Sequence, residues 1–348
     1  MAQDQAGAQS RGARVCRLAP SMCAALERLL ARSSRHVARR FSTRRFGTHA
    51  AVCSKAPTSI GEFNVDFASP LGVGACGAVY SARHRQTSQE VAVKVMSPAL
   101  PGRGESTPEE VADAIEQEGQ AFAHVLQGGV HHPHVVDVMG CFTGASSEAQ
   151  QLGLQVEEAS PQDPVHYFVM ERLQGQSLQD RITADGGFDE GRAKEVARAM
   201  CEGLAFLHEH GIAHRDVCPR NVHYPELGSD DDDVKIIDFS HAGVLPQEAS
   251  RGAAYFDKKL GTAGFVAPEV LMERDPYSSK CDVYSLGCTV HAMLANGKLP
   301  RRHPRIGIMK CLPPTVSKQA LAFMDAALSP SPDERPAIAD IINDPWLQ

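Results

Sequence analysis

The octapeptide His214-Arg-Asp-Val-Cys-Pro-Arg-Asn221 and the tripeptide Asp238-Phe-Ser240, which begins seventeen positions after Asn221, decide the fold of this chain. An acid lies five residues before an amide, and a second acid follows a short apolar run. Such a set supplies a base for a hydroxyl group and two oxygen ligands for magnesium. The stretch therefore indicates the chemistry of phosphoryl transfer.

Two patterns upstream fit the same chemistry. The segment Leu71-Gly-Val-Gly-Ala-Cys-Gly-Ala-Val-Tyr80 lies between alternating apolar runs and predicts a hairpin. A glycine-rich turn can approach phosphates closely because no side chain stands in the way. The alternative is an ordinary glycine-containing hairpin. The segment Val91-Ala-Val-Lys94, at a suitable distance, is an alternating strand pattern that carries a single lysine.

Three more patterns lie downstream: the segments 261–269 (GTAGFVAPE) and 282–287 (DVYSLG), then Arg335. In this order the patterns resemble the eukaryotic protein kinase family over roughly residues 60–348. The resemblance implies an α+β, bilobal fold. A small, mainly β N-lobe with one key helix would span about 60–172, and a larger, mainly α C-lobe about 173–348.

The resemblance also assigns the site. Asp216 would accept or orient the proton of the substrate hydroxyl, Asn221 and Asp238 would hold Mg²⁺, and Lys94 would bind the α- and β-phosphates of ATP. Met170 would be the gatekeeper before the adenine-binding hinge. The expected nucleotide-binding set is Leu71, Gly72, Gly74, Cys76, Gly77, Val79, Ala92, Lys94, Glu118, Met170, Glu171 and Leu173.

A helix that supplies a partner for Lys94 is predicted from the capping box Thr107-Pro-Glu-Glu110, which places its start near Pro108. The residues expected on its inner face are Val111, Ile115, Glu118 and Phe122. We expect Glu118 to pair with Lys94, because Glu116 points elsewhere at helical spacing. The alternative is that Glu118 is simply solvated.

Other elements follow from local patterns. We expect strands at Val135–Phe142 and Val165–Met170, a long surface loop at 144–164, and a helix at Asp189–His210. The acidic tract Gly228–Asp233 lacks EF-hand spacing and is expected to be a solvated loop.

The resemblance assigns a structural role to several C-lobe residues. Glu269 and Arg335 would form an ion pair, and Asp282 would bond the backbone of the catalytic loop. Thr262 would lie beside the catalytic aspartate, as in serine/threonine kinases, and the ending Pro345-Trp-Leu347 resembles the same branch.

Three departures weigh against activity. Cys218 stands where serine/threonine kinases have a lysine, Ser240 replaces a hinge glycine, and 296–314 is short where the family builds a helix. Arg220 occupies the place of a compensating arginine of tyrosine kinases. We expect an active serine/threonine kinase. The alternatives are a pseudokinase that binds nucleotide or partners, and a dual-specificity or tyrosine kinase.

Two hypotheses concern how activity would be regulated. The position that the family commonly phosphorylates is Lys258, so by hypothesis Asp257 faces Arg215 as a fixed negative charge. The alternative is that Asp257 is a solvated loop residue and that Arg215 pairs elsewhere. Cys76 and Cys218 are expected to border the γ-phosphate as oxidisable thiols, although most cysteines are inert.

Composition and charge indicate the cellular compartment and the kind of partner to expect. The net charge is −7, ten cysteines show no CxxC pair, and no apolar run is long enough to span a membrane, which fits a protein of a reducing compartment. The expected partners are a protein substrate and ATP, without nucleic acid, for a monomeric kinase domain.

Residues 1–55 hold ten arginines and two acids and predict an amphipathic helix. This indicates import into a mitochondrion or other organelle; the alternatives are a disordered basic tail in the cytoplasm or a wrongly chosen start codon.

Overall fold

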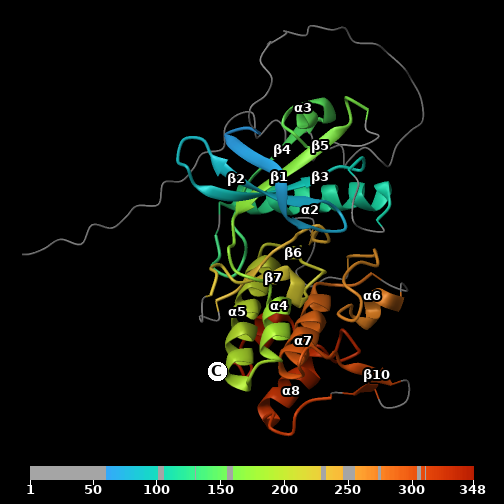
Figure 1. Cartoon of the computed structure of the whole chain (residues 1–348). Coiled ribbons are helices and arrows are strands. Elements are labelled where there is room, and N and C mark those ends of the chain that lie inside the picture. Colours follow the sequence, from blue (N-terminus) through green and yellow to red (C-terminus); the bar gives the residue numbers. More distant parts are fainter. Residues whose placement is uncertain are drawn as a thin grey trace, which may run out of the picture.

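A computed structural model describes residues 60–100, 106–129, 131–154, 160–228, 233–245, 255–272, 276–303, 307–309 and 311–348. These residues form two lobes, with a β-sheet lobe above a helical lobe in Figure 1. The expected import helix lies outside the described residues, and so do Ser250 and the centre of the acidic tract, 229–232.

The N-lobe is built on a five-stranded antiparallel sheet in the order β1-β2-β3-β5-β4. Its strands are β1 (Phe63–Val73), β2 (Ala78–His84), β3 (Glu90–Met96), β4 (Val138–Ala145) and β5 (Pro164–Glu171). The central strand β3 is buried from Val91 to Met96, which its run of apolar residues allows. In this register Lys94 lies between Val79 of β2 and Phe168 of β5, so the lysine is held by the middle of the sheet.

Helix α2 (Pro108–Gly128) packs against this sheet and confirms the predicted start. The hydroxyl of Thr107 accepts from the backbone N–H of Glu110, and the Glu110 carboxylate accepts from the N–H of Thr107. The helix ends at Gly129, whose φ of 58° is the left-handed value that favours glycine. The inner face that was expected to carry Glu118 is buried.

The C-lobe surrounds helix α7 (Lys280–Leu294), which is buried at every residue from Cys281 to Leu294. It packs against the two helices α5 (Glu190–Glu209) and α8 (Lys318–Ala327). The other C-lobe helices are α4 (Leu178–Asp185), α6 (Pro268–Met272), α9 (Ile338–Ile341) and the 3₁₀ helix η1 (Pro219–Asn221). The helix expected at Asp189–His210 is confirmed as α5, with the side chain of Asp189 capping its first turn.

The described part of the C-lobe also contains three short antiparallel strand pairs, of which the first two flank the catalytic loop. They are β6 (Ile212–Ala213) with β9 (Gly243–Val244), β7 (Val222–His223) with β8 (Lys235–Ile236), and β10 (Arg301–His303) with β11 (Gly307–Met309). The octapeptide therefore leaves β6 and enters β7, and the Asp238 tripeptide lies between β8 and β9.

Two expected boundaries are wrong. The strand expected from Val135 begins only at Val138, because Val135 and Val136 pair with Ile236 of the C-lobe instead of with β5. The expected surface loop after it contains the short helix α3 (Ser146–Gln151). Ser146 is buried there and donates to the carbonyl of Asp163, which gives this segment a packed structure.

Two findings concern the described part of the chain as a whole. Within it, no helix combines the length and hydropathy that a membrane span requires. The cysteines resolved there are all free thiols: Cys76, Cys141, Cys201, Cys218, Cys281, Cys288 and Cys311.

Candidate active site

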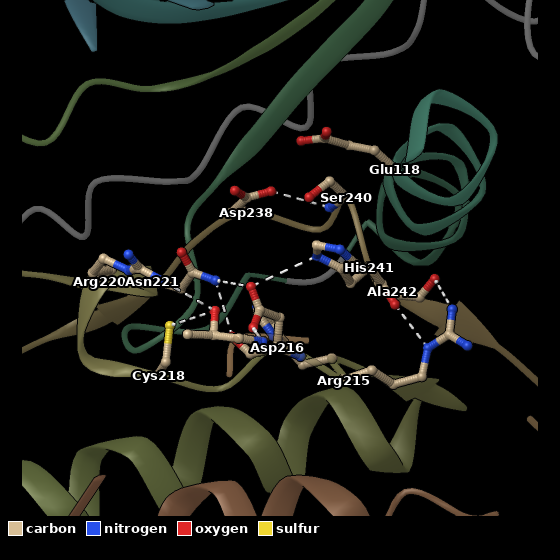
Figure 2. Close-up of polar contacts among 12 residues, drawn as sticks. Glu118, Arg215, Asp216, Cys218, Arg220, Asn221, Asp238, Ser240, His241 and Ala242 are labelled. Atoms are coloured by element: carbon tan, nitrogen blue, oxygen red, sulfur yellow. Dashed lines mark hydrogen bonds and ion pairs between the residues drawn. The ribbon is translucent and has the colours of Figure 1, made fainter. Parts of the chain in front are cut away.

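The residues of the sequence motifs meet between the two lobes. Strand β3 and helix α2 supply Lys94 and Glu118 from the N-lobe. The loop between β6 and β7 supplies Asp216 and Asn221, and the segment after β8 supplies Asp238. Figure 2 shows Glu118 and Asp238 on the upper side and Asp216 with Asn221 below them.

Lys94 joins the two lobes through two carboxylates. Its Nζ donates to Oε2 of Glu118 at 2.6 Å and to Oδ1 of Asp238 at 2.7 Å. The Glu118 side chain is fully buried, so an unpaired charge there would be costly. The expected partnership of Lys94 with Glu118 is thus confirmed. Glu116 is exposed and accepts from the side chain of Gln120 instead.

The two carboxylates that share Lys94 differ in their ionisation. Burial raises the pKa of Glu118 and outweighs the opposing effect of Lys94. Burial also opposes the ionisation of Asp238, but the charge of Lys94 and hydrogen bonds from Ser240 outweigh it and hold the pKa of Asp238 well below its ordinary value. Asp238 is also the more exposed of the two, with 34% of its side chain accessible. It is therefore the carboxylate suited to hold a cation.

The carboxylate of Asp216 is held in place by two donors. Oδ1 accepts from the backbone N–H of Thr262 at 2.7 Å, and Oδ2 accepts from Nδ2 of Asn221 at 2.8 Å. The same Asn221 nitrogen donates to the Asp216 carbonyl at 2.9 Å. The expected position of Thr262 beside the catalytic aspartate is confirmed.

Asp282, a buried acid of α7, holds the start of the catalytic loop by hydrogen bonds. The Asp282 carboxylate accepts from the backbone N–H groups of His214 at 2.8 Å and Arg215 at 2.7 Å, as expected. It also contacts Nε2 of His208 at 2.8 Å. Arg215 has a φ of 63°, and an arginine keeps such a left-handed conformation only where its surroundings enforce it.

The second expected scaffold contact is the ion pair between Glu269 and Arg335. The Arg335 guanidinium donates to both oxygens of the Glu269 carboxylate, at 2.6 and 3.0 Å, and its side chain is fully buried. This bidentate pair confirms the expectation and ties α6 to the segment before α9.

The serine that replaces glycine in the Asp238 tripeptide causes no backbone strain here. The left-handed residue is Asp238 itself, with a φ of 66°, whereas Ser240 does not have a positive φ. The backbone N–H of Ser240 donates to Oδ1 of Asp238 at 3.1 Å (Figure 2). The backbone at position 240 therefore does not require glycine.

Aromatic rings connect the catalytic loop to the N-lobe. The ring of Phe239 lies 5.7 Å from that of His214 and 6.1 Å from that of Phe122 on α2, between ring centroids. Phe122 in turn lies 5.2 Å from Phe168 of β5. These contacts hold α2, and with it Glu118, in place above the catalytic loop.

The glycine-rich turn leaves room for a ligand. A Cβ atom added to Gly77 would come within 2.3 Å of the carbonyl oxygen of Val95, so only glycine allows the turn to lie this close to β3. At Gly72 an added Cβ would meet nothing within 4 Å, and at Gly74 only one backbone oxygen, at 3.7 Å. The backbone at Gly72 and Gly74 is therefore uncrowded, which is what a close approach of phosphates would need.

The remaining residues of the expected nucleotide site line the neighbouring strands. Ala92 and Met170 face each other in the β3–β5 register, and Glu171 ends β5. Leu71 is exposed, whereas Cys76, Val79 and Leu173 are half-buried. The Glu171 carboxylate accepts from Lys235 and from the N–H of Asp137, and the Glu171 N–H donates to the carbonyl of Asp137 at 2.9 Å, so an adenine base could use only the Glu171 carbonyl.

Cys218 and Arg220 of the catalytic loop both lie near the side chain of Thr262. Cys218 is buried, and its thiol lies 3.6 Å from the hydroxyl of Thr262. Nη2 of the exposed Arg220 lies 3.5 Å from the same hydroxyl. Burial raises the pKa of Cys218 and also that of Cys76, where it outweighs Lys94. Both shifts oppose the ionisation that was expected of these thiols, and their oxidation stays a prediction.

The expected contact between Arg215 and Asp257 is not formed. Nε of Arg215 donates to the carbonyl of His241 at 2.7 Å, and Nη2 donates to that of Ala242 at 3.0 Å (Figure 2). The guanidinium also stacks on Phe256, 4.7 Å from its ring centroid. Because these partners already satisfy Arg215, a fixed anion is not required.

Sequence reasoning missed His241, which follows the Asp238 tripeptide directly. Its Nδ1 lies 3.6 Å from Oδ2 of Asp216. The only signal was its place one residue after a metal-binding motif, and no periodicity or spacing marks such a residue as part of a site.

A model of the protein kinase domain matches residues 65–347. The chain is similar to the putative CBL-interacting protein kinase 27 of Oryza sativa subsp. japonica, with 28% identity over 290 residues, 80% of this chain and 62% of the relative. It is similar to the serine/threonine-protein kinase RAD53 of Saccharomyces cerevisiae, with 29% identity over 308 residues, 80% of this chain and 32% of the relative. It is also similar to the serine/threonine-protein kinase PknB of Mycolicibacterium smegmatis, with 31% identity over 224 residues, 64% of this chain and 31% of the relative. The chain thus spans less than two thirds of the length of these relatives.

Proposed function

This chain belongs to the eukaryotic-type serine/threonine protein kinase family, and we propose that it is an active kinase that transfers the γ-phosphate of ATP to serine or threonine hydroxyls of a protein. The observation that carries the proposal is the double contact of Lys94 with Glu118 and Asp238. This contact places the lysine, the helix α2 and the metal-binding carboxylate in one arrangement, which phosphoryl transfer requires.

The residues present fit both expected ligands. Asp238, whose low pKa keeps it ionised, and Asn221 offer oxygens of the kind that Mg²⁺ prefers. No cluster of three or more His, Cys, Asp or Glu side chains suited to a metal occurs in the described part of the chain, so the nucleotide would have to complete the coordination. When bound, ATP supplies the phosphoryl group and Mg²⁺ neutralises its charge.

In this proposal each side chain has one task. Lys94 binds phosphate oxygens of the nucleotide, Glu118 orients Lys94, and the turn at Gly72–Gly77 covers the phosphates with backbone groups. Asp216 receives the acceptor hydroxyl. Its two oxygens already accept from Thr262 and Asn221, which fixes the carboxylate while leaving lone pairs for the substrate.

A second candidate, a pseudokinase, is favoured by one observation. Cys218 is a buried, neutral side chain where the resembling family has a lysine, so one cation is missing near the phosphate. Arg220 supports the proposal of activity, because its guanidinium reaches the hydroxyl of Thr262 beside Asp216 and can supply the missing charge.

The test is phosphate transfer by the purified full-length chain with Mg-ATP and a generic protein substrate. We expect Lys94→Met and Asp238→Asn each to reduce kcat/KM at least about 100-fold. The control is Glu116→Gln, an exposed acid of the same helix as Glu118, which should stay within about twofold. Transfer that persists in both site variants would refute the proposal. Nucleotide binding without transfer in the wild type would support the pseudokinase.

A further inference from the structure

The loop 131–137, between α2 and β4, packs against the C-lobe. Its backbone pairs with β8, because the N–H of Val136 donates to the carbonyl of Ile236 and the N–H of Ile236 donates to the carbonyl of His134, both at 2.9 Å. Ile236 lies two residues before Asp238 on the same segment. The loop therefore connects the end of α2 to the segment that carries the metal-binding carboxylate.

His134 joins this loop to the C-lobe through both of its ring nitrogens. Nδ1 lies 3.0 Å from the carbonyl oxygen of Val234, and Nε2 lies 3.4 Å from Oε2 of Glu202 on α5. Only 11% of the histidine side chain is accessible, so water cannot easily replace these partners. A carbonyl and a carboxylate can only accept hydrogen bonds. The ring satisfies both partners only when each nitrogen carries a hydrogen, which is the imidazolium form.

His132, two residues earlier, has the opposite requirement. Its Nδ1 accepts from the backbone N–H of His134 at 3.2 Å, so this nitrogen carries no hydrogen. Its ring stacks on that of Phe206 of α5, with 5.1 Å between the ring centroids and 24° between the planes. A second proton on His132 would go to Nδ1, where it would meet the N–H of His134 and break this hydrogen bond. His132 therefore fits the loop as a neutral imidazole.

The groups around the His132 ring also favour its neutral form. Burial is the largest effect and lowers the pKa of His132 below its ordinary value of 6.5, and a charge on His134 lowers it further. Lys235 of β8 acts in the same direction, whereas Glu202 and Glu209 of α5 oppose it. Other contacts engage the titratable groups nearby: His131 with Asp137, His210 with the carbonyl of Phe206, and Lys235 with Glu171.

We infer that the turn His132-Pro-His134 is a pH-sensitive clamp that holds the end of α2 to the C-lobe and is complete only when His134 carries the extra proton and His132 does not. Because folding lowers the pKa of His132, its contribution to stability is present above pH 6.5 and is lost as the pH falls below it. At alkaline pH, loss of the His134 proton leaves Nε2 and the Glu202 carboxylate as two facing acceptors. The clamp itself does not depend on the proposed kinase function, whereas its effect on activity rests on that function.

The first experiment measures hydrogen–deuterium exchange of the loop 131–137 in the full-length protein from pH 5 to pH 9, corrected for the intrinsic pH dependence of exchange. The wild type should exchange slowest at an intermediate pH and faster on both sides, by at most about tenfold per pH unit for each proton. His132→Asn, whose side-chain oxygen can still accept the N–H of His134, should lose the faster exchange at acid pH. His134→Gln, which cannot be protonated, should lose the faster exchange at alkaline pH.

The matched control is His131→Gln, which changes a histidine of the same loop with 71% of its side chain accessible and should keep the wild-type profile. Glu202→Gln changes a side chain that is 41% accessible, so the variant should fold, and it should lose the faster alkaline exchange as His134→Gln does. A wild-type profile in both His132→Asn and His134→Gln, or no pH dependence in the wild type, would overturn the inference.

The second experiment is a pH profile of phosphate transfer over the same range. His132→Asn should keep more activity than the wild type as the pH falls below 6.5, because its loop still holds α2. An unchanged activity profile in His132→Asn, with a changed exchange profile, would contradict the effect of the clamp on the site. Absence of transfer by the wild type at every pH would contradict the kinase function instead, and the exchange measurements would still decide whether the clamp exists.

Discussion

Lys258 donates to the carboxylate of Asp113 at 2.7 Å, and this ion pair ties the segment after β9 to helix α2. Position 258 is the one that the family commonly phosphorylates, yet here it carries a positive charge. Arg215 is satisfied by backbone carbonyls and by Phe256, so neither residue needs a phosphate. We propose that the unphosphorylated chain is active and that the ion pair of Lys258 with Asp113 helps to hold the segment after β9 in place.

Lys258→Ala should therefore lower activity, but only by about two- to fivefold. Both side chains are about half exposed, and such a pair contributes no more than about 1 kcal/mol and weakens in salt. The measurement is kcat/KM of unphosphorylated protein at low and high ionic strength. Asp113→Ala should have the same effect and the double variant no additional one. Asp257→Ala should have none, and a larger loss for Asp257→Ala than for Lys258→Ala would refute the role of the pair.

Ser240→Gly should leave activity within about twofold, because the backbone of Ser240 has no positive φ and so does not depend on the choice between serine and glycine. The variant should lower the free energy of unfolding by about 0.5–1 kcal/mol, since glycine gives the unfolded chain more freedom. Chemical denaturation and kcat measure the two effects. A several-fold gain in activity would show instead that the serine restrains the site.

Asp282→Asn should destabilise the protein by about 2–4 kcal/mol at neutral pH, because a buried carboxylate that accepts two backbone N–H bonds is lost. Burial opposes its ionisation, but His208, His214 and the backbone bond outweigh this and lower the pKa of Asp282. A depressed pKa contributes stability above the unfolded value near 4, and this contribution is lost as the pH falls. The difference in unfolding free energy between wild type and variant should therefore shrink below about pH 4. A constant difference from pH 7 to pH 3 would contradict this account.

Arg220 should set a preference for acidic residues near the acceptor, because its exposed guanidinium lies beside Thr262 at the substrate side of Asp216. A peptide library phosphorylated by the wild type should be enriched in acidic residues. Arg220→Glu should shift the preference toward basic residues, and Arg220→Gln should leave none. A basic preference in the wild type would refute the assignment.

The parts of the site that could be predicted from the sequence have local patterns. A capping box and an apolar periodicity place Glu118 on the inner face of α2, and the alternating run places Lys94 on a central strand. The pairing of the two residues then follows from the sheet packing against the helix. The family resemblance supplied the contacts of Asp282 and of Glu269 with Arg335, which no local pattern reveals.

Predictions from the sequence were wrong or incomplete where long-range contacts override local patterns. Val135 has strand propensity but pairs with Ile236 of the other lobe, so β4 begins later than expected. Arg215 was expected to pair with an anion, whereas it donates to backbone carbonyl oxygens of the turn after Asp238. The proximity of His241 to Asp216 and the left-handed conformation of Asp238 are features that composition and periodicity do not show.

The central claim is that this chain transfers phosphate through Asp216. The most direct measurement is phosphate incorporation into a peptide library, with each site located by mass spectrometry, by wild type and Asp216→Asn at pH 7.5 with Mg-ATP. The account predicts phosphoserine or phosphothreonine from the wild type and at least about a 100-fold lower rate from the variant. Equal incorporation by the two proteins, or none by the wild type while it binds ATP, would contradict it.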